Sequence, residues 1–195
     1  MKMLYGAIAL VLAHSVQAAP NSDTVIRLQV ASIDSTKADT VQHDRTINDD
    51  EQHWVDQTEQ ALIKEMTKNK ALAQRMSNER LRRELLHTIY YEAKRAGLEP
   101  ALVVSVIRGE SNFRKYAISS AGARGFMQVM PFWADIVGSE SADLFNVRTN
   151  LRLGCAILRS YLDKENGNIT RALARYNGSR ASDVYPNYIY AAWVN

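Results

Sequence analysis

Cysteine is nearly absent from this 195-residue sequence, which contains Cys155 and no other. A single cysteine cannot form an internal disulfide, so the fold has to be held by packing. Cys155 lies at helical spacing from the leucines around it, which favours a small buried apolar residue. The alternative, a catalytic thiol, needs a partner histidine, and none of His43, His53 and His87 lies in a recognisable place.

Motifs for metals and nucleotides are also lacking. The sequence contains no His-Glu-x-x-His, no cysteine pair, no EF-hand loop and no Walker-type glycine-rich loop. We therefore expect no cofactor and no metal site.

The sequence lacks a hydrophobic run long enough to span a bilayer, which takes about 20 apolar residues. The apolar stretch from Leu4 to Ala13 is shorter, follows the basic Lys2 and precedes the small-residue site Val16-Gln17-Ala18. This pattern is typical of a secretory signal peptide, residues 1–18, with an uncleaved anchor as the alternative. We predict a periplasmic protein, exported by this signal, with no stable membrane insertion after cleavage.

Charge is distributed unevenly along the chain. Residues 19–60 hold three basic and nine acidic side chains, whereas residues 61–98 hold nine basic and four acidic ones. A basic patch can bind anionic polymers. For an exported protein, peptidoglycan or a membrane surface is a better anion than nucleic acid, which we do not expect as a partner. A solvated helix face is the simplest interpretation.

The composition changes twice along the chain. Residues 19–47 are polar and predict a flexible tether, interrupted by the apolar patch from Val25 to Val30. Residues 48–76 predict a helical extension that begins at Asn48, with Glu51 in the position of a capping box. Residues 77–195 form the main predicted domain.

That domain shows helical periodicity throughout. A helix starts at Ser77 or Asn78, carries an apolar stripe that includes Leu81, and stops at Gly97. Pro100 then begins a helix that is apolar almost all round and therefore central, with a buried strand as the alternative. Further helices are expected at 133–137, 147–165, 169–176 and 186–194. We predict an all-α domain behind an N-terminal helical and disordered extension.

Glu110 lies at the last turn of this central apolar helix. A carboxyl group there loses solvation, which raises its pKa and keeps it protonated near neutral pH. A general acid for a glycosidic oxygen needs such a group. The simpler alternative is a carboxylate that points into water at a helix end.

Three motifs then resemble a known family. Glu110-Ser111-x-Phe113 is followed by Ser119-x-x-Gly-Ala-x-Gly-Phe-Met-Gln-Val-Met-Pro131, and later by Arg175 to Ser179 and Tyr185 to Tyr188. Together they are similar to the signature of family 1 lytic transglycosylases, the lysozyme-like enzymes that cut bacterial peptidoglycan. The likeness covers residues 80 to 194.

The resemblance implies a lysozyme-like transglycosylase (SLT) domain and a lyase reaction. Glu110 would protonate the glycosidic oxygen and then, as carboxylate, take the proton of the C6 hydroxyl of N-acetylmuramic acid. The product is a 1,6-anhydro sugar. The resemblance further implies a set of substrate-binding residues: Ser119 beside the acetamido group, then Met127, Gln128, Met130, Tyr176 with its hydroxyl on Glu110, Asn177 and Tyr188. Tyr-Asn-Gly-Ser replaces the Tyr-Asn-Ala-Gly of many members, and Phe126 replaces a leucine.

Two other functions remain open. A hydrolytic muramidase of the same fold would release reducing ends. A non-catalytic wall-binding module could serve a secretion system, a pilus or another wall-spanning machine, with residues 19–76 as the docking element.

Overall fold

The computed structural model describes residues 46–136, 143–179 and 182–193, and its described part is helical. The predicted signal peptide, the apolar patch from Val25 to Val30 and nearly all of the predicted tether lie outside these residues. The helices are α2 (Asp49–Met66), α3 (Lys70–Arg75), α4 (Glu79–Arg95), α5 (Pro100–Ser111), α6 (Pro131–Ile136), α7 (Val147–Lys164), α8 (Ile169–Tyr176) and α9 (Val184–Trp193). The described residues form isolated β-bridges but no strand, so the all-α prediction is confirmed. None of these helices is long and apolar enough to cross a bilayer.

Asparagine side chains begin most of the helices. In α2, α3, α4, α7 and α8 the N-cap is Asn48, Asn69, Asn78, Asn146 and Asn168 respectively, and each side chain accepts a hydrogen bond from the third helical N–H. This bond satisfies one of the donors that a helix start leaves free. The local sequence alone therefore fixes where these helices start.

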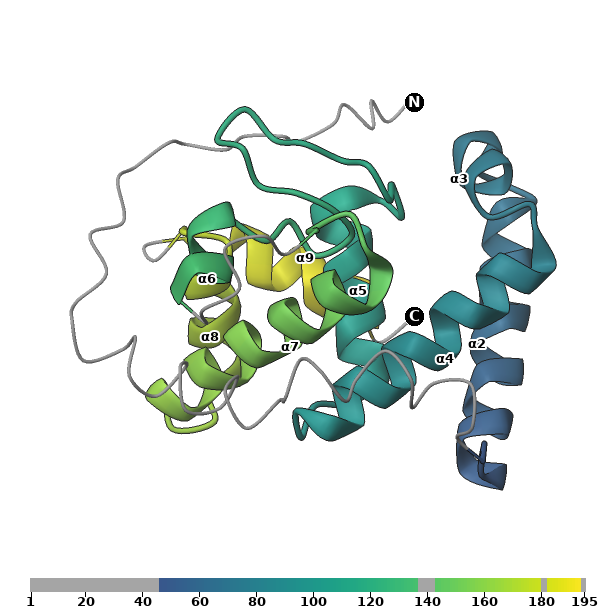
Figure 1. Ribbon diagram of the computed structural model, residues 1–195, viewed down its shortest axis with the longest axis horizontal. Coiled ribbons are helices and arrows are strands. Elements are labelled where there is room, and N and C mark those ends of the chain that lie inside the picture. Colours follow the sequence, from purple (N-terminus) through teal and green to yellow (C-terminus); the bar gives the residue numbers. More distant parts are fainter. Residues whose placement is uncertain (1–45, 137–142, 180–181, 194–195) are drawn as a thin grey trace.

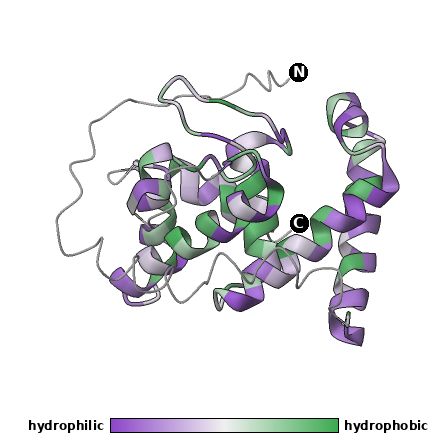
Figure 2. Ribbon diagram, in the orientation of Figure 1, coloured by the Kyte–Doolittle hydropathy of each residue, from purple (hydrophilic) through white to green (hydrophobic). Residues whose placement is uncertain are grey.

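Helix α5 forms the centre of the domain, as its sequence predicts. Val103, Val106 and Ile107 are fully buried, and α5 packs against α4 on one side and α9 on another. Figure 2 shows it as the most apolar helix in the middle of the molecule, while α2 is largely polar. The alternative of a buried strand is wrong. The predicted stripe of α4 needs one correction, because Leu81 is 55% exposed.

Helix α7 packs between α4 and α8 (Figure 1). Cys155 lies on its buried side with 1% of its surface exposed, and burial raises the pKa of its thiol far above the ordinary value. A thiol that resists ionisation is a poor nucleophile, which agrees with the prediction of a packing residue.

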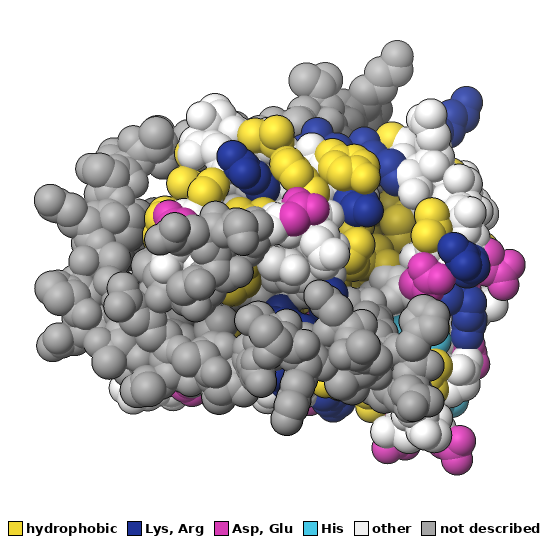
Figure 3. Space-filling view, viewed as in Figure 1, with side chains coloured by type: hydrophobic (Ala, Val, Ile, Leu, Met, Phe, Trp, Pro, Cys, Tyr) yellow, Lys and Arg dark blue, Asp and Glu magenta, His cyan; other side chains and the backbone are white. Residues whose placement is uncertain are grey.

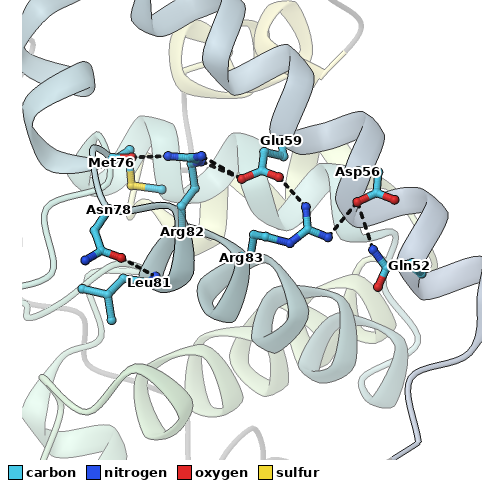
Figure 4. A network of polar contacts seen from close by, with 8 residues as sticks. All are labelled: Gln52, Asp56, Glu59, Met76, Asn78, Leu81, Arg82 and Arg83. Atoms are coloured by element: carbon cyan, nitrogen blue, oxygen red, sulfur yellow. Dashed lines mark hydrogen bonds and ion pairs between the residues drawn. The ribbon is translucent and has the colours of Figure 1, made fainter.

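The polar helix α2 packs along α4 at one side of the domain (Figure 1), and charged groups hold the two together. Glu59 of α2 and Arg82 of α4 are buried and form an ion pair at 2.8 Å (Figure 4). Arg83 contacts both Glu59 and Asp56. Glu51, fully buried, lies 2.8 Å from His87 of α4. The helix is thus anchored by buried polar contacts where its apolar stripe is thin.

Candidate active site

Glu110 occupies the last turn of α5, where the helix ends abruptly. The next two residues, Asn112 and Phe113, both adopt left-handed backbone conformations, with φ of 48° and 58°. Such conformations cost of order 1–3 kcal/mol each for residues other than glycine. The buried Phe113 side chain, 3% exposed, anchors this turn in the core. Strained backbone of this kind clusters at functional sites.

The surroundings of Glu110 raise its pKa from 4.5 to about 7. Burial is the main cause, because it disfavours the charged form. Hydrogen bonds from Tyr185 and Asn177 act in the opposite direction, and the Tyr185 hydroxyl lies 2.6 Å from Oε1 of Glu110. The balance leaves a carboxyl group that can both donate and accept a proton near neutral pH.

The tyrosine on the acid is not the one that the resemblance implied. The Tyr176 hydroxyl donates to the carbonyl oxygen of Met127 at 2.8 Å, whereas Tyr185 donates to Glu110. Tyr176 therefore fixes the backbone of the neighbouring loop. Tyr185 begins the last of the family-like motifs, Tyr185 to Tyr188, but its role depends on how α9 packs against α5. No local sequence pattern reveals that packing.

Gly109 makes this close packing of α9 possible. A Cβ atom at this position would lie 2.6 Å from the end of the Ile189 side chain and 3.4 Å from the Tyr188 ring, so a side chain here would force Ile189 of α9 to move. Tyr185 is within 3.6 Å of the same point. The glycine that precedes Glu110 thus brings its hydroxyl partner within reach.

The loop from Ala117 to Met130 follows α5 in the chain, and Asn150 of α7 holds it in place. Asn150 is 1% exposed; it accepts from the N–H of Met127 at 2.8 Å and donates to the carbonyls of Arg124 and Leu144, both at 2.9 Å. Gly125, with φ of 76°, leaves room for this amide. Sequence reasoning missed Asn150, because a polar residue in a helix gives no sign that it is buried.

The structure gives the predicted substrate residues different environments. Ser119 is partly buried, and its Oγ accepts from the Ala123 N–H at 3.0 Å. Gln128 is also partly buried, with φ of 49°, and its amide donates to the carbonyls of Ala117 and Gly125. Its side chain therefore braces the loop.

Met127 was expected to contact the substrate, but its side chain is fully buried and packs against α7. It belongs to the core, where it cannot reach a ligand, and contributes its carbonyl to Tyr176. Met130 is partly buried and Tyr188 is 51% exposed. Asn177 contacts the Glu110 carboxyl, which the resemblance did not imply.

The outer face of the loop region carries aromatic and basic side chains. Tyr116 and Ile118 are 69% and 66% exposed, and the Tyr116 ring lies 5.8 Å from that of Phe145. Lys115 and Arg124 lie over these rings. Figure 3 shows hydrophobic and basic side chains side by side on this face.

These features define a helical domain in which one carboxyl group, Glu110, has a raised pKa and a tyrosine hydroxyl as its partner. The Transglycosylase SLT domain family matches residues 87–184, half of the chain, and the protein belongs to this family.

Individual relatives match a similar part of the chain. A transglycosylase of Enterobacteria phage PRD1 is 35% identical over 91 residues, which cover 47% of this chain and 33% of the relative. Membrane-bound lytic murein transglycosylase C of Actinobacillus pleuropneumoniae serotype 5b is 34% identical over 102 residues, 48% of this chain and 28% of the relative. The chain thus spans a third or less of these relatives.

Among solved structures, an inactive mutant of lytic transglycosylase Slt from Pseudomonas aeruginosa matches with 34% identity and a TM-score of 0.43. The match covers 48% of this chain and 16% of that one.

Proposed function

We propose that this protein is a lytic transglycosylase that cleaves the β-1,4 bond between N-acetylmuramic acid and N-acetylglucosamine in peptidoglycan. Its membership of the SLT family supports the reaction class. The observation that carries the assignment of the acid is the pKa of Glu110, raised to about 7.

In the first step, protonated Glu110 donates its proton to the glycosidic oxygen, and the bond from that oxygen to C1 of N-acetylmuramic acid breaks. In the second step, the Glu110 carboxylate removes the proton of the C6 hydroxyl of the same sugar, whose oxygen bonds to C1. Glu110 is then protonated again and no water is consumed. A group with a pKa near the working pH can perform both transfers.

Conventional glycosidases use two carboxylates, but substrate-assisted enzymes use one. The pKa of Glu110 is set by burial, Tyr185 and Asn177, and no second carboxylate of the described residues is among these causes. Asp163 and Glu165 are paired with Arg159 and Arg175. This supports a one-carboxylate mechanism, in which the acetamido group of the substrate stabilises positive charge at C1.

Tyr185 orients the acid in this mechanism. Its hydroxyl donates to Oε1 and thereby restricts the rotation of the carboxyl group. Asn177 also stabilises the carboxylate that forms after the first step. Ser119, Met130 and Tyr188 are proposed to contact the sugar, whereas Met127 and Gln128 shape the loop around it.

The proposed place of action is the periplasm, reached through the signal peptide at residues 1–18. Mature protein and its Glu110→Gln variant should be incubated with purified sacculi, and the soluble products analysed by mass spectrometry. We expect anhydro-muropeptides from the wild type and none from the variant. Products heavier by one water would indicate a hydrolytic muramidase, and full activity of Glu110→Gln would refute the role of Glu110.

A further inference from the structure

The helices α2 and α3 precede the family match, which starts at residue 87, yet both are bonded to the end of α5 that carries Glu110. Glu65 of α2 pairs with Arg108 at 2.5 Å, and Arg75 of α3 donates to the carbonyl of Asn112 at 3.1 Å. The two contacts thus lie two residues before and two residues after the acid.

We propose that residues 49–76 act as a brace that positions Glu110, with Glu65 and Arg75 as the positioning residues. This inference rests on the proposed function, in which Glu110 is the acid. It assigns to the N-terminal helices a role in the reaction of this chain, in addition to any docking role.

The brace has a firm support on its other side. The buried pair of Glu59 and Arg82 fixes α2 to α4. Arg82 also donates to the carbonyl of Met76 at 2.7 Å, which holds the end of α3 (Figure 4). Arg75 directly precedes Met76, so a continuous series of contacts leads from α4 through Arg82 and α3 to the turn after Glu110.

The turn needs such support because it is strained. Asn112 and Phe113 adopt successive left-handed conformations, and strain of this kind persists only where the surroundings enforce it. Phe113 is held by the core. Arg75 bonds the carbonyl of Asn112, the other strained residue.

Neither contact stabilises the fold strongly. The side chains of Glu65 and Arg108 are 29% and 27% exposed, and pairs of this kind contribute little to the free energy of unfolding. Their effect should therefore be on geometry, where a displacement of about 1 Å can cost up to about a hundredfold in rate. A positioning role predicts that kcat falls clearly while the free energy of unfolding changes little.

The test uses the full chain with Glu65→Gln and Arg75→Met. Turnover is measured on a soluble glycan of two N-acetylglucosamine–N-acetylmuramic acid repeats. We expect each variant to lower kcat about five- to tenfold, with KM within about twofold of the wild type. Arg75→Lys keeps a donor on a long side chain and should restore most of kcat.

Asp56→Asn is the matched control. Asp56 lies on α2 nine residues before Glu65, about 13 Å along the helix, and contacts Arg83 of α4 instead of α5. It should leave kcat unchanged. If Asp56→Asn lowers kcat as much as Glu65→Gln does, general loosening of α2 explains the effect and the proposal is wrong.

A second readout does not depend on activity. NMR titration of Glu110 with ¹³C-labelled glutamate should give a midpoint of about 7 in the wild type. Glu65→Gln removes a negative charge, which lowers this midpoint by itself, so Arg75→Met is the deciding variant. Removal of the positive charge of Arg75 alone would raise the midpoint, whereas opening of the carboxyl to water shifts it downward. An unchanged or raised midpoint in Arg75→Met would overturn the brace, even if the wild type cuts no glycan and the proposed function fails.

Discussion

Replacing Glu110 with glutamine should stabilise the protein at alkaline pH. The pKa of Glu110 is about 7 in the folded protein and near 4.5 when exposed. A carboxyl group whose pKa is raised on folding contributes stability that is fully present below its unfolded pKa. That stability is lost as the pH rises through the folded value. The wild type therefore loses stability between pH 4.5 and pH 7, and a neutral amide does not.

The magnitude follows from the shift. A rise of about 2.5 pKa units at about 1.4 kcal/mol per unit amounts to about 3 kcal/mol. Glutamine keeps an oxygen that can accept from Tyr185, so the variant retains that hydrogen bond. We expect the free energy of unfolding of Glu110→Gln, relative to wild type, to increase by about 3 kcal/mol from pH 4 to pH 8.

Urea unfolding followed by tryptophan fluorescence at pH 4, 6 and 8 measures this difference. Asp135→Asn is the control, because Asp135 is an exposed carboxylate on α6 and its removal should change stability by less than about 0.5 kcal/mol at any pH. Parallel stability curves for wild type and Glu110→Gln would show that the folded protein does not perturb this acid.

Three further substitutions test the surroundings of the site. Tyr185→Phe removes a hydrogen bond that lowers the pKa of Glu110, so the alkaline limb of the rate profile should move to higher pH and kcat should fall about tenfold; an unchanged profile would contradict the contact. Gly125→Ala places a Cβ atom 2.4 Å from the Asn150 amide at a φ of 76° and should destabilise the fold by about 2–4 kcal/mol in urea; wild-type stability would mean that the loop adjusts freely. Arg82→Met breaks the buried pair between α4 and α2 and should cost about 2–3 kcal/mol, since the carboxylate keeps its second arginine; a neutral result would show that α2 is held by other contacts.

The helices and their ends could be predicted because local chemistry determines them. Asn48 and Asn78 cap helices at the predicted positions, and Pro100 starts α5. The break after α7 lies between the predicted helices 147–165 and 169–176, where Asn166 and Gly167 adopt positive φ. These signals need no knowledge of the tertiary structure.

The contacts around the acid could not be predicted in the same way. Tyr176 and Tyr185 are both aromatic residues in family-like motifs, and which hydroxyl reaches Glu110 depends on the packing of α8 and α9 against α5. The burial of charged side chains could not be predicted from the sequence either. Glu59 is a polar residue in sequence, and its environment depends on Arg82, 23 positions away.

The distance along the chain between Glu110 and its hydroxyl partner has a consequence for synthesis. Tyr185 follows Glu110 by 75 residues. At about 5–20 residues per second, a ribosome needs several seconds to make that segment. During this interval α9 has not been made, so neither Tyr185 nor the packing of α9 against α5 is present. We therefore expect the Glu110 carboxyl of the growing chain to be less buried than in the folded protein, with a pKa below about 7 until the later helices have docked.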